Sequence, residues 1–292
     1  MSAALARTVF GTAFQNPLLL AAGTAGFGQE LAGVIDLERL GGIVTKAVSL
    51  QPRAGNAAPR VAEFRGGMMN SVGLANPGLD GVRQGKLPWL ATHLQRARVL
   101  VNVVGFRESE YAEVVAGLDG EPGFLGYELN LSCPNTAAGG IEFGADPVAV
   151  GRIVAACRRA TRRPLVVKIS PALPDIVAIA LAARDAGADG VSLVNTLPGY
   201  LFRPGGREPR LGNGNGGVSG PALLPVGILA TRRVAERTGG EFPIIGVGGV
   251  TTAADVRQYL AAGAQLVAVG TACLADPRQP GRILHGLERH HG

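Results

Sequence analysis

The chain has 292 residues, of which 47% are hydrophobic, and its formal net charge at pH 7 is +6. No apolar run reaches the roughly 18 residues of a membrane helix, and no N-terminal signal peptide is recognisable, so we expect a cytoplasmic protein that does not contact membranes. Its arginines are scattered rather than collected into one basic stripe, which argues against nucleic-acid binding.

Eight apolar runs predict buried β-strands along the whole chain. They lie at Pro17–Gly23, Gly42–Val48, Arg98–Gly105, Tyr127–Ser132, Pro164–Ser170, Gly190–Thr196, Phe242–Val250 and Leu266–Thr271. An apolar period of 3.6 predicts helices between them, including Val148–Ala160, Asp175–Ala186, Ala222–Thr238 and Thr252–Ala262. Eight strands that are each followed by a helix are typical of an α/β protein with a (β/α)8, or TIM, barrel. We therefore predict one such domain over residues 1–292.

The competing fold is a doubly wound open sheet. It would contain fewer strands, and its first strand would lead into a G-x-G-x-x-G turn. Gly23-Thr24-Ala25-Gly26 matches that pattern only loosely, so the barrel is favoured.

Two connections are too long to be simple turns. Ser49–Gly85 follows the second predicted strand, and Leu197–Gly220 follows the sixth and contains the Gly- and Asn-rich tract Gly212–Gly217. Loops of this length are usually functional or disordered. Because both follow the C-terminal ends of strands, where barrel enzymes keep their sites, we expect a cap and a mobile lid there. A further site loop is expected after the fourth strand. A surface loop without function remains an alternative for the glycine tract.

The fourth predicted strand and its loop carry the most informative motif. An otherwise aliphatic strand contains Asn130 and then leads into Cys133 and Asn135. Strand interiors disfavour Asn, because a buried amide must find hydrogen-bonding partners. The motif therefore suggests a site for a planar ligand beside a nucleophile or base. A cysteine packed as a small hydrophobic residue is the alternative, and the motif alone does not decide between them.

The chain contains only three lysines, Lys46, Lys86 and Lys168. Lys46 and Lys168 fall at the C-terminal ends of the second and fifth predicted strands, on the same rim as Cys133. In a chain that otherwise uses Arg, lysines at such positions suggest a need for compact point charges. Three asparagines share the rim and complete a set suited to an anionic, amide-rich molecule: Asn102, Asn130 and Asn195.

Glycines after the last two predicted strands suggest a phosphate site. They lie in Gly246–Val250 and in Val269–Thr271, and Gly220 precedes the sixth helix. Loops after strands seven and eight of such barrels commonly bind phosphate, and glycines let backbone N–H groups approach its oxygens. Tight strand-to-helix turns would explain one cluster but not both. A phosphate next to cations and amides fits flavin mononucleotide (FMN) well.

These residues resemble class 1 dihydroorotate dehydrogenases over nearly the whole chain, and the class 1B catalytic subunit most of all. The resemblance rests on Thr45-Lys46, Asn70–Leu74, Asn76-Pro77-Gly78, Asn130–Asn135, Val166–Ser170, Val194–Thr196, Gly216–Pro221, Gly248-Gly249 and Gly270-Thr271. It implies that dihydroorotate is oxidised to orotate in pyrimidine biosynthesis, with Cys133 as the catalytic base. Class 2 enzymes use Ser as the base, so Cys133 also favours class 1.

The resemblance also implies two sets of binding residues. Substrate would contact Lys46, Asn70, Ser71, Val72, Gly73, Leu74, Asn130, Asn195 and Thr196. FMN would contact Ala22, Gly23, Thr45, Lys46, Asn102, Asn130, Lys168, Val194, Gly220, Gly248, Gly249, Gly270 and Thr271. Two positions depart from the family pattern. Ala22 stands where Ser is frequent, and Thr136-Ala137-Ala138 lacks the usual charged residues.

Cysteine usage limits the electron-transfer chemistry of this chain. Cys157 lies on the apolar face of a predicted helix and is expected in the core, whereas Cys273 could line the phosphate region. Three cysteines do not provide the four ligands of an iron–sulfur cluster. By resemblance to class 1B, FAD and a 2Fe–2S cluster would belong to a partner subunit that reduces NAD, and the chain would form a homodimer. No metal site is expected in this chain.

Three alternatives remain open from the sequence. A flavin domain like that of dihydropyrimidine dehydrogenase shares the Asn-Leu-Ser-Cys-Pro pattern, but there His is common where this chain has Asn135. A flavin-free phosphate-binding barrel lyase would leave the strand-end asparagines unexplained. A non-catalytic flavoprotein subunit would have no need for Cys133, Lys46 and Lys168.

Overall fold

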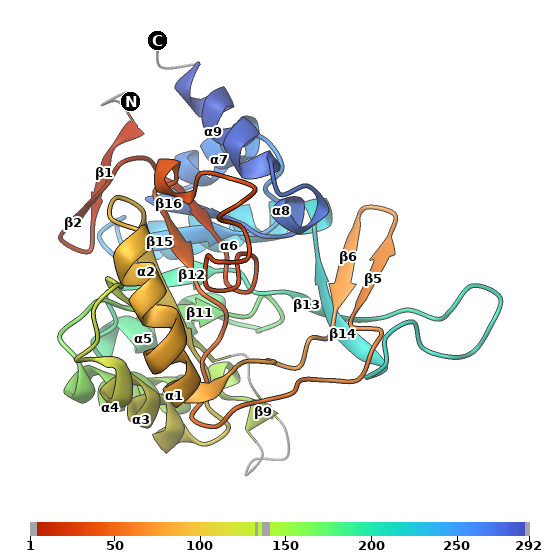
Figure 1. The fold of residues 1–292 in the computed structure, drawn as a ribbon, viewed down its shortest axis with the longest axis horizontal. Coiled ribbons are helices and arrows are strands. Elements are labelled where there is room, and N and C mark those ends of the chain that lie inside the picture. The colour runs from red at the N-terminus through yellow and green to blue at the C-terminus, as the bar shows by residue number, and fades with distance from the viewer. Residues whose placement is uncertain (1–4, 132–133, 136–140, 290–292) are drawn as a thin grey trace.

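A computed structural model describes residues 5–131, 134–135 and 141–289 of the protein. Its centre is a closed barrel of eight parallel strands (Figure 1). The strands are β3 (Leu18–Leu20), β4 (Gly42–Val44), β7 (Arg98–Val103), β8 (Gly126–Asn130), β11 (Leu165–Ile169), β12 (Gly190–Leu193), β15 (Ile244–Val247) and β16 (Leu266–Val269). Each pairs with the next in this order, and β16 pairs with β3 to close the ring. The predicted TIM barrel and its eight strands are therefore confirmed.

Helices surround this barrel on the outside. They are α1 (Gly78–Gly81), α2 (Leu87–His93), α3 (Glu108–Leu118), α4 (Pro147–Ala160), α5 (Ile176–Asp185), α6 (Leu224–Arg237), α7 (Ala253–Ala261), α8 (Thr271–Ala275) and α9 (Gln279–Glu288). A π-helix at Val82–Lys86 joins α1 to α2, and short 3-10 helices lie at Leu37–Arg39, Phe143–Ala145 and Pro221–Leu223. The four helices that the apolar periodicity predicted correspond to α4, α5, α6 and α7.

The connection after β3 contradicts the expectation that every strand is followed by a helix. Between β3 and β4 the chain runs through turns and the 3-10 helix Leu37–Arg39, without an α-helix. Gly23, Gly26 and Gly28 have φ angles of +77°, +57° and +91° in this segment. An α-helix requires negative φ, so these glycines produce turns instead.

Two apolar layers hold the barrel together. Inside the barrel, side chains such as Leu19, Leu100 and Val166 form one buried cluster. The N-terminal hairpin of β1 (Arg7–Val9) and β2 (Thr12–Phe14) adds Val9 and Phe14 to it. Alternate residues of the same strands point outward and pack against the helices in a second, larger cluster. Position along a barrel strand therefore tells which residues face the interior.

The two long connections build a second sheet rather than irregular loops. The segment after β4 forms the hairpin of β5 (Val61–Phe64) and β6 (Gly67–Asn70), and the segment after β12 forms β13 (Leu197–Tyr200) and β14 (Asn215–Ser219). These strands join in the antiparallel order β13-β14-β6-β5 and lie beside the barrel, at the right of Figure 1. Half of the glycine tract that was expected to be a mobile lid is thus part of β14.

The loop expected after the fourth barrel strand is described only in part. It contains the short pair β9 (Pro134–Asn135) and β10 (Ile141–Glu142). Residues 132–133 and 136–140, which include Cys133, lie outside the described residues.

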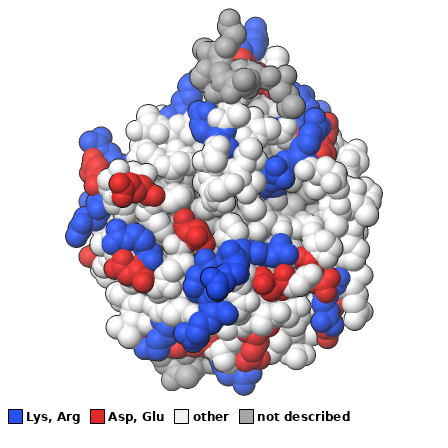
Figure 2. All heavy atoms as spheres, turned by 90° about the vertical axis from the view of Figure 1, so that its left-hand side faces the viewer, with Lys and Arg blue, Asp and Glu red and all other residues white. Residues whose placement is uncertain are grey.

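The charges on the surface are of both signs. The face in Figure 2 carries a short band of basic side chains with acidic residues on its flanks. Several arginines are paired with carboxylates, as in Arg152–Glu108 and Arg158–Asp189. In the part of the chain that the structure describes, no helix is long and apolar enough to cross a membrane.

Candidate active site

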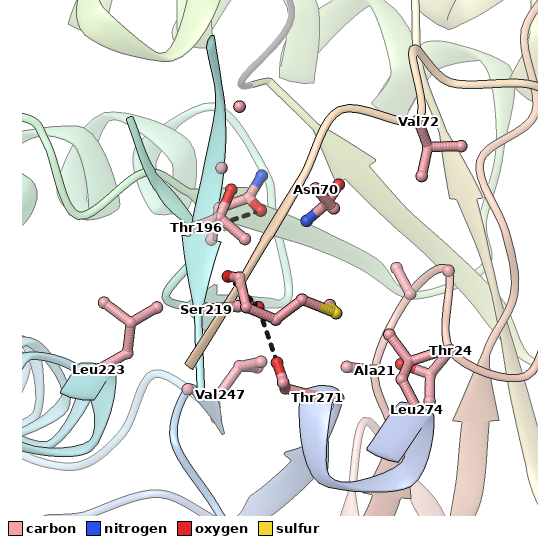
Figure 3. A pocket seen from close by; sticks show the side chains of 18 of the residues that line it. Ala21, Thr24, Asn70, Val72, Thr196, Ser219, Leu223, Val247, Thr271 and Leu274 are labelled. Carbon is pink, nitrogen blue, oxygen red and sulfur yellow. Dashed lines mark hydrogen bonds between the residues drawn. The ribbon is translucent and has the colours of Figure 1, made fainter. Parts of the chain in front are cut away.

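A cavity of about 650 Å³ lies at the C-terminal ends of the barrel strands. Barrel-strand ends provide one part of its wall, and β6, β13 and β14 of the second sheet provide another. Figure 3 shows Asn70, the last residue of β6, and Val72 beyond that strand, with Thr196 and Ser219 near them and Val247 and Thr271 below. Its volume lies within the range of about 300–1,000 Å³ that is usual for small-molecule sites.

The cavity brings together nearly all of the predicted site residues. Its lining includes Ala22, Gly23, Lys46, Asn70, Ser71, Val72, Gly73, Leu74, Asn102, Asn130, Lys168, Val194, Asn195, Thr196, Gly220, Gly248, Gly249, Gly270 and Thr271. Thr45 does not line it. Its buried hydroxyl donates to the carbonyl of Lys46 at 2.9 Å and accepts from the backbone N–H of Asn102 at 3.2 Å, so it supports two lining residues from behind. Cys133, the predicted base, lies outside the described residues.

Glycines form one end of the cavity, next to β15, β16 and the start of α6. Gly220, Gly248 and Gly249 have φ angles of +108°, +123° and +72°, which side chains other than Gly rarely tolerate. A Cβ atom on Gly249 would lie 2.4 Å from the backbone nitrogen of Leu224. This end of the cavity therefore depends on backbone that can approach a ligand closely.

Hydroxyls from two distant segments meet at the same end. Thr271, at the start of α8, donates from its hydroxyl to Ser219 of β14 at 2.8 Å (Figure 3). The Ser219 hydroxyl also lies 3.3 Å from the carbonyl oxygen of Met68 in β6, to which it can donate. Ser219 was not among the predicted site residues. The contact ties the second sheet to the glycine end of the barrel.

Amide side chains line the opposite part of the cavity. Asn195 donates from Nδ2 to Oδ1 of Asn130 at 3.2 Å, and its own Oδ1 accepts from the Thr196 backbone N–H at 2.8 Å. The hydroxyl of Tyr111 donates to the carbonyl of Asn130 at 2.9 Å. These bonds fix the direction in which each amide can meet a ligand.

The segment that follows β6 is also held in place. Asn56 donates from Nδ2 to the Ser71 hydroxyl at 2.8 Å. Gly73 and Leu74 both have positive φ, +72° and +57°. A non-glycine residue in this conformation is uncommon and is found where the surroundings impose it. The segment therefore presents a defined surface to the cavity.

The two lysines of the cavity differ in their surroundings. Lys46 is half-buried, its backbone N–H donates to Gly26 at 2.7 Å, and its ammonium forms no ion pair with the described residues. Lys168 is only 7% exposed, and its Nζ lies 4.0 Å from Oε1 of Glu128. Lys46 is thus available for a ligand anion, whereas Lys168 is part of a buried charge pair.

Glu128 lies beneath the cavity and does not line it. It is 1% exposed, and its Oε1 accepts from Asn102 Nδ2 at 2.7 Å while its Oε2 accepts from the Ser192 hydroxyl at 2.6 Å. Sequence reasoning missed this residue as part of the site. The signal was available, because a carboxylate at an inward position of a buried strand almost always needs partners.

The family profile described as "Dihydroorotate dehydrogenase" matches residues 4–290. The chain belongs to the dihydroorotate dehydrogenase family. It is 45% identical to a dihydroorotate dehydrogenase B (NAD(+)) catalytic subunit of Pelobacter propionicus, over 96% of this chain and 90% of the relative. A subunit of the same name from Geotalea uraniireducens is 44% identical over 97% and 91%.

A third relative has a different acceptor in its name. A Solibacter usitatus protein that provisionally carries the name dihydroorotate dehydrogenase A (fumarate) is 45% identical over 98% of this chain and 93% of its own length. Dihydroorotate dehydrogenases of this family are FMN-dependent oxidoreductases that convert dihydroorotate to orotate in pyrimidine biosynthesis. The family membership confirms the resemblance and the enzyme class.

The cavity of this dihydroorotate dehydrogenase fits FMN. Asn102 lines the cavity, and its buried Oδ1 has no hydrogen-bond partner among the described residues, so it is left to accept from a ligand N–H. A Cβ atom at Gly249 would collide with the backbone of Leu224, so the glycine end keeps its shape only with glycine there. Lys168 adds a cation. A hydrogen-bond acceptor and a cation suit the flavin ring, and the glycine backbone suits the phosphate tail.

The two cysteines that the structure describes take no part in the cavity. Cys157 is fully buried in α4, as expected, and burial raises the pKa of its thiol to about 12. Cys273 is 2% exposed, and burial raises its pKa to about 11. The expectation that Cys273 could line the phosphate region is wrong, because its side chain joins the outer core cluster instead. Within the described ranges no group of His, Cys, Asp and Glu is arranged to hold a metal ion.

Proposed function

We propose that this dihydroorotate dehydrogenase works as the catalytic subunit of an NAD-dependent, class 1B enzyme, with residues 1–292 acting as one FMN-binding domain. The observation that supports it best is the cavity itself, where Lys46, Lys168 and three strand-end asparagines meet a glycine-rich end. Each of these residue types suits one part of FMN or dihydroorotate.

Substrate would be held by the polar wall. Lys46 is the proposed partner of the substrate carboxylate, because its ammonium lines the cavity and forms no ion pair with described residues. The amides of Asn130 and Asn195 and the hydroxyl of Thr196 would orient the pyrimidine ring. The segment from Asn70 to Leu74 would cover it. Charge-assisted hydrogen bonds are stronger than neutral ones, so Lys46 is expected to contribute most to affinity.

Cys133 is proposed as the base that removes a proton from the carbon next to the substrate carbonyl. A free thiol has a pKa near ~8.5, and a nearby cation can lower it to a useful value. None of the four histidines competes for the role. His93 ends α2, and His285, His290 and His291 lie near the C-terminus. Bound FMN supplies the chemistry that accepts the hydride from the substrate.

The remaining cofactor residues would serve the flavin. Lys168 is proposed to place a fixed positive charge beside the ring, and Asn102 to accept a hydrogen bond from it. Ala22, Gly23 and Val194 are proposed neighbours of the ring, and Thr45 would act from behind by supporting Lys46 and Asn102. Gly220, Gly248, Gly249, Gly270 and Thr271 would hold the phosphate with backbone N–H groups and a hydroxyl.

Electron transfer to NAD would need a partner subunit that carries FAD and a 2Fe–2S cluster. The names of the first two relatives support this, and so does the count of three cysteines in this chain, one fewer than the four ligands that a cluster generally needs. A homodimer of this chain and a cytoplasmic location complete the proposal. The name of the Solibacter usitatus relative makes direct reduction of fumarate the second candidate.

One experiment separates the acceptors. The purified chain, loaded with FMN, is reduced with dihydroorotate without oxygen and mixed with fumarate, a quinone or NAD. The same series is repeated after co-expression with a candidate FAD and iron–sulfur subunit encoded in the same genome. We expect NAD reduction only with the partner and slow turnover with fumarate. Rapid fumarate reduction by the chain alone would contradict the class 1B proposal.

A further inference from the structure

The floor of the cavity is a closed polar cluster inside an otherwise apolar barrel. Asn102, Glu128, Lys168 and Ser192 all occupy inward positions on the neighbouring strands β7, β8, β11 and β12. Their neighbours along the strands, such as Val101 and Val167, point outward into the outer core cluster. Each of the four is at most 7% exposed.

Glu128 connects the members of this cluster. Its two oxygens accept from Asn102 at 2.7 Å and from Ser192 at 2.6 Å, and Lys168 lies 4.0 Å away. Oε1 is therefore close to both the Asn102 side-chain amide and the Lys168 ammonium. Only Asn102 and Lys168 of these residues line the cavity, so Glu128 can reach a bound flavin only through them.

The hydrogen bond from Asn102 to Glu128 determines which group of the Asn102 side chain remains for a ligand. Because Glu128 accepts from Nδ2, the amide is turned so that its Oδ1 is left as the free acceptor among the described residues. Asn could otherwise present a donor or an acceptor to a ligand. Glu128 thereby engages the donor of Asn102 and leaves its acceptor unused.

The contact with Lys168 determines how much positive charge the floor presents. An unpaired ammonium would act on a ligand with its full charge, whereas a carboxylate 4.0 Å away offsets part of it. In a buried site such charges act more strongly than in water.

We propose that Glu128 is a positioning residue that sets the reduction potential of bound FMN, by anchoring Lys168 and balancing its charge and by orienting Asn102. The proposal rests on the proposed function, because it takes Lys168 and Asn102 as neighbours of the flavin. It assigns to Glu128 a task that the family membership does not describe.

The test is a redox titration of FMN bound to four proteins: wild type, E128Q, K168Q and the E128Q/K168Q double variant. Gln has the shape of Glu and can still accept from Asn102 and donate to the Ser192 hydroxyl, so E128Q removes charge with little other change. S192A is the matched control, since it removes one hydrogen bond of the same cluster without altering charge.

We expect E128Q to raise the equilibrium constant for FMN reduction at least tenfold. For a two-electron couple this corresponds to a midpoint potential that is higher by about 30 mV. K168Q should shift the equilibrium in the opposite direction, and the double variant should lie between K168Q and E128Q. S192A should change the equilibrium by less than about threefold. A merely structural Glu128 would lower the melting temperature and FMN retention without raising the potential.

If the equilibrium constant for FMN reduction in E128Q is within twofold of the wild-type value, the proposal is overturned. If K168Q still lowers the potential, only the role of Glu128 is wrong; if K168Q also has no effect, the proposed role of Lys168 fails too. Should E128Q not retain FMN, the double variant and K168Q give the same test. K168Q and the double variant differ only at residue 128, so their comparison isolates the charge of Glu128. The double variant also has no unpaired buried charge at these two positions. Equal potentials in the two would again overturn the proposal.

Discussion

The two ends of the cavity recognise ligands by different physical means. At the polar end, side chains from β7, β8, β11 and β12 supply amides and charges, and nearly every one has a partner inside the protein. At the glycine end, Gly220, Gly248 and Gly249 supply backbone in conformations that exclude side chains. Burying a polar side chain without a partner costs free energy. A glycine costs conformational entropy, because it loses more backbone freedom on folding than other residues do. Ligand binding is therefore weakened at the polar end by removing a side chain and at the glycine end by adding one.

The largest effect should come from removing the proposed base, Cys133. We expect C133A to bind FMN normally but to lose about two to four powers of ten in the rate of FMN reduction by dihydroorotate, as is typical when a general base is removed. Anaerobic stopped-flow absorbance measures this rate.

The matched variant C133S should retain part of the rate, with its pH profile shifted upward, because a hydroxyl is harder to deprotonate than a thiol. Near-wild-type rates in C133A would show that another group removes the proton.

A smaller effect is expected from the cation at the polar end. K46A should weaken orotate binding by about 10- to 100-fold, because a hydrogen bond to a charged group contributes about 1.5–3 kcal/mol. FMN should stay bound. Orotate titration followed by the flavin difference spectrum measures the affinity, and K86A is the control. Lys86 donates to Gln29 and does not line the cavity. Equal losses in K46A and K86A would contradict the assignment.

The smallest effect concerns the helix that supports the glycine end. Asp255 of α7 accepts from the backbone and hydroxyl of Thr251, both at 2.9 Å, and from the Thr252 backbone at 2.8 Å. Burial alone would raise the pKa of Asp255, but these hydrogen bonds outweigh it and hold the pKa below its ordinary value. D255N should therefore cost about 1 kcal/mol of unfolding free energy at pH 7, as for other lost helix caps.

The pH dependence of that cost has a defined sign. A carboxyl whose pKa is lowered by folding stabilises the protein above its unfolded pKa of about 3.9, and this stability is lost as pH falls through the folded value. Urea unfolding of wild type and D255N should thus converge as pH falls below about 4. D185N, at the exposed end of α5, is the control. A difference that stays constant with pH would contradict the role of Asp255.

The barrel strands and many residues of both cavity ends could be predicted from the sequence. The eight strands and the lysines and asparagines at their ends could be predicted, because strand periodicity and strand-end position are local properties. The glycine end could be predicted from residue type and its place after the last two strands. Cys157 was correctly expected in the core.

What could not be predicted depends on contacts between distant segments. The sheet of β13, β14, β6 and β5 pairs residues about 150 positions apart, as the pairing of Ser219 with Met68 illustrates. Pairing register between two remote hairpins leaves no local pattern. The partners of Glu128 were missed for the same reason, since they lie on β7, β11 and β12.

The most direct test of the division between the two ends is the affinity of the apoprotein for FMN and for riboflavin, which lacks the phosphate, in wild type and G249A. A Cβ on Gly249 would lie 2.4 Å from the Leu224 backbone nitrogen, so the change displaces the backbone of the glycine end. G239A is the control, because Gly239 also has positive φ, +64°, but nothing lies within 4 Å of its Cβ position. We expect wild type and G239A to prefer FMN by about 100-fold, from the charge-assisted hydrogen bonds to the phosphate. G249A should lose most of that preference while riboflavin affinity changes little. An equal loss of affinity for both flavins in G249A, or an unchanged preference, would contradict the account.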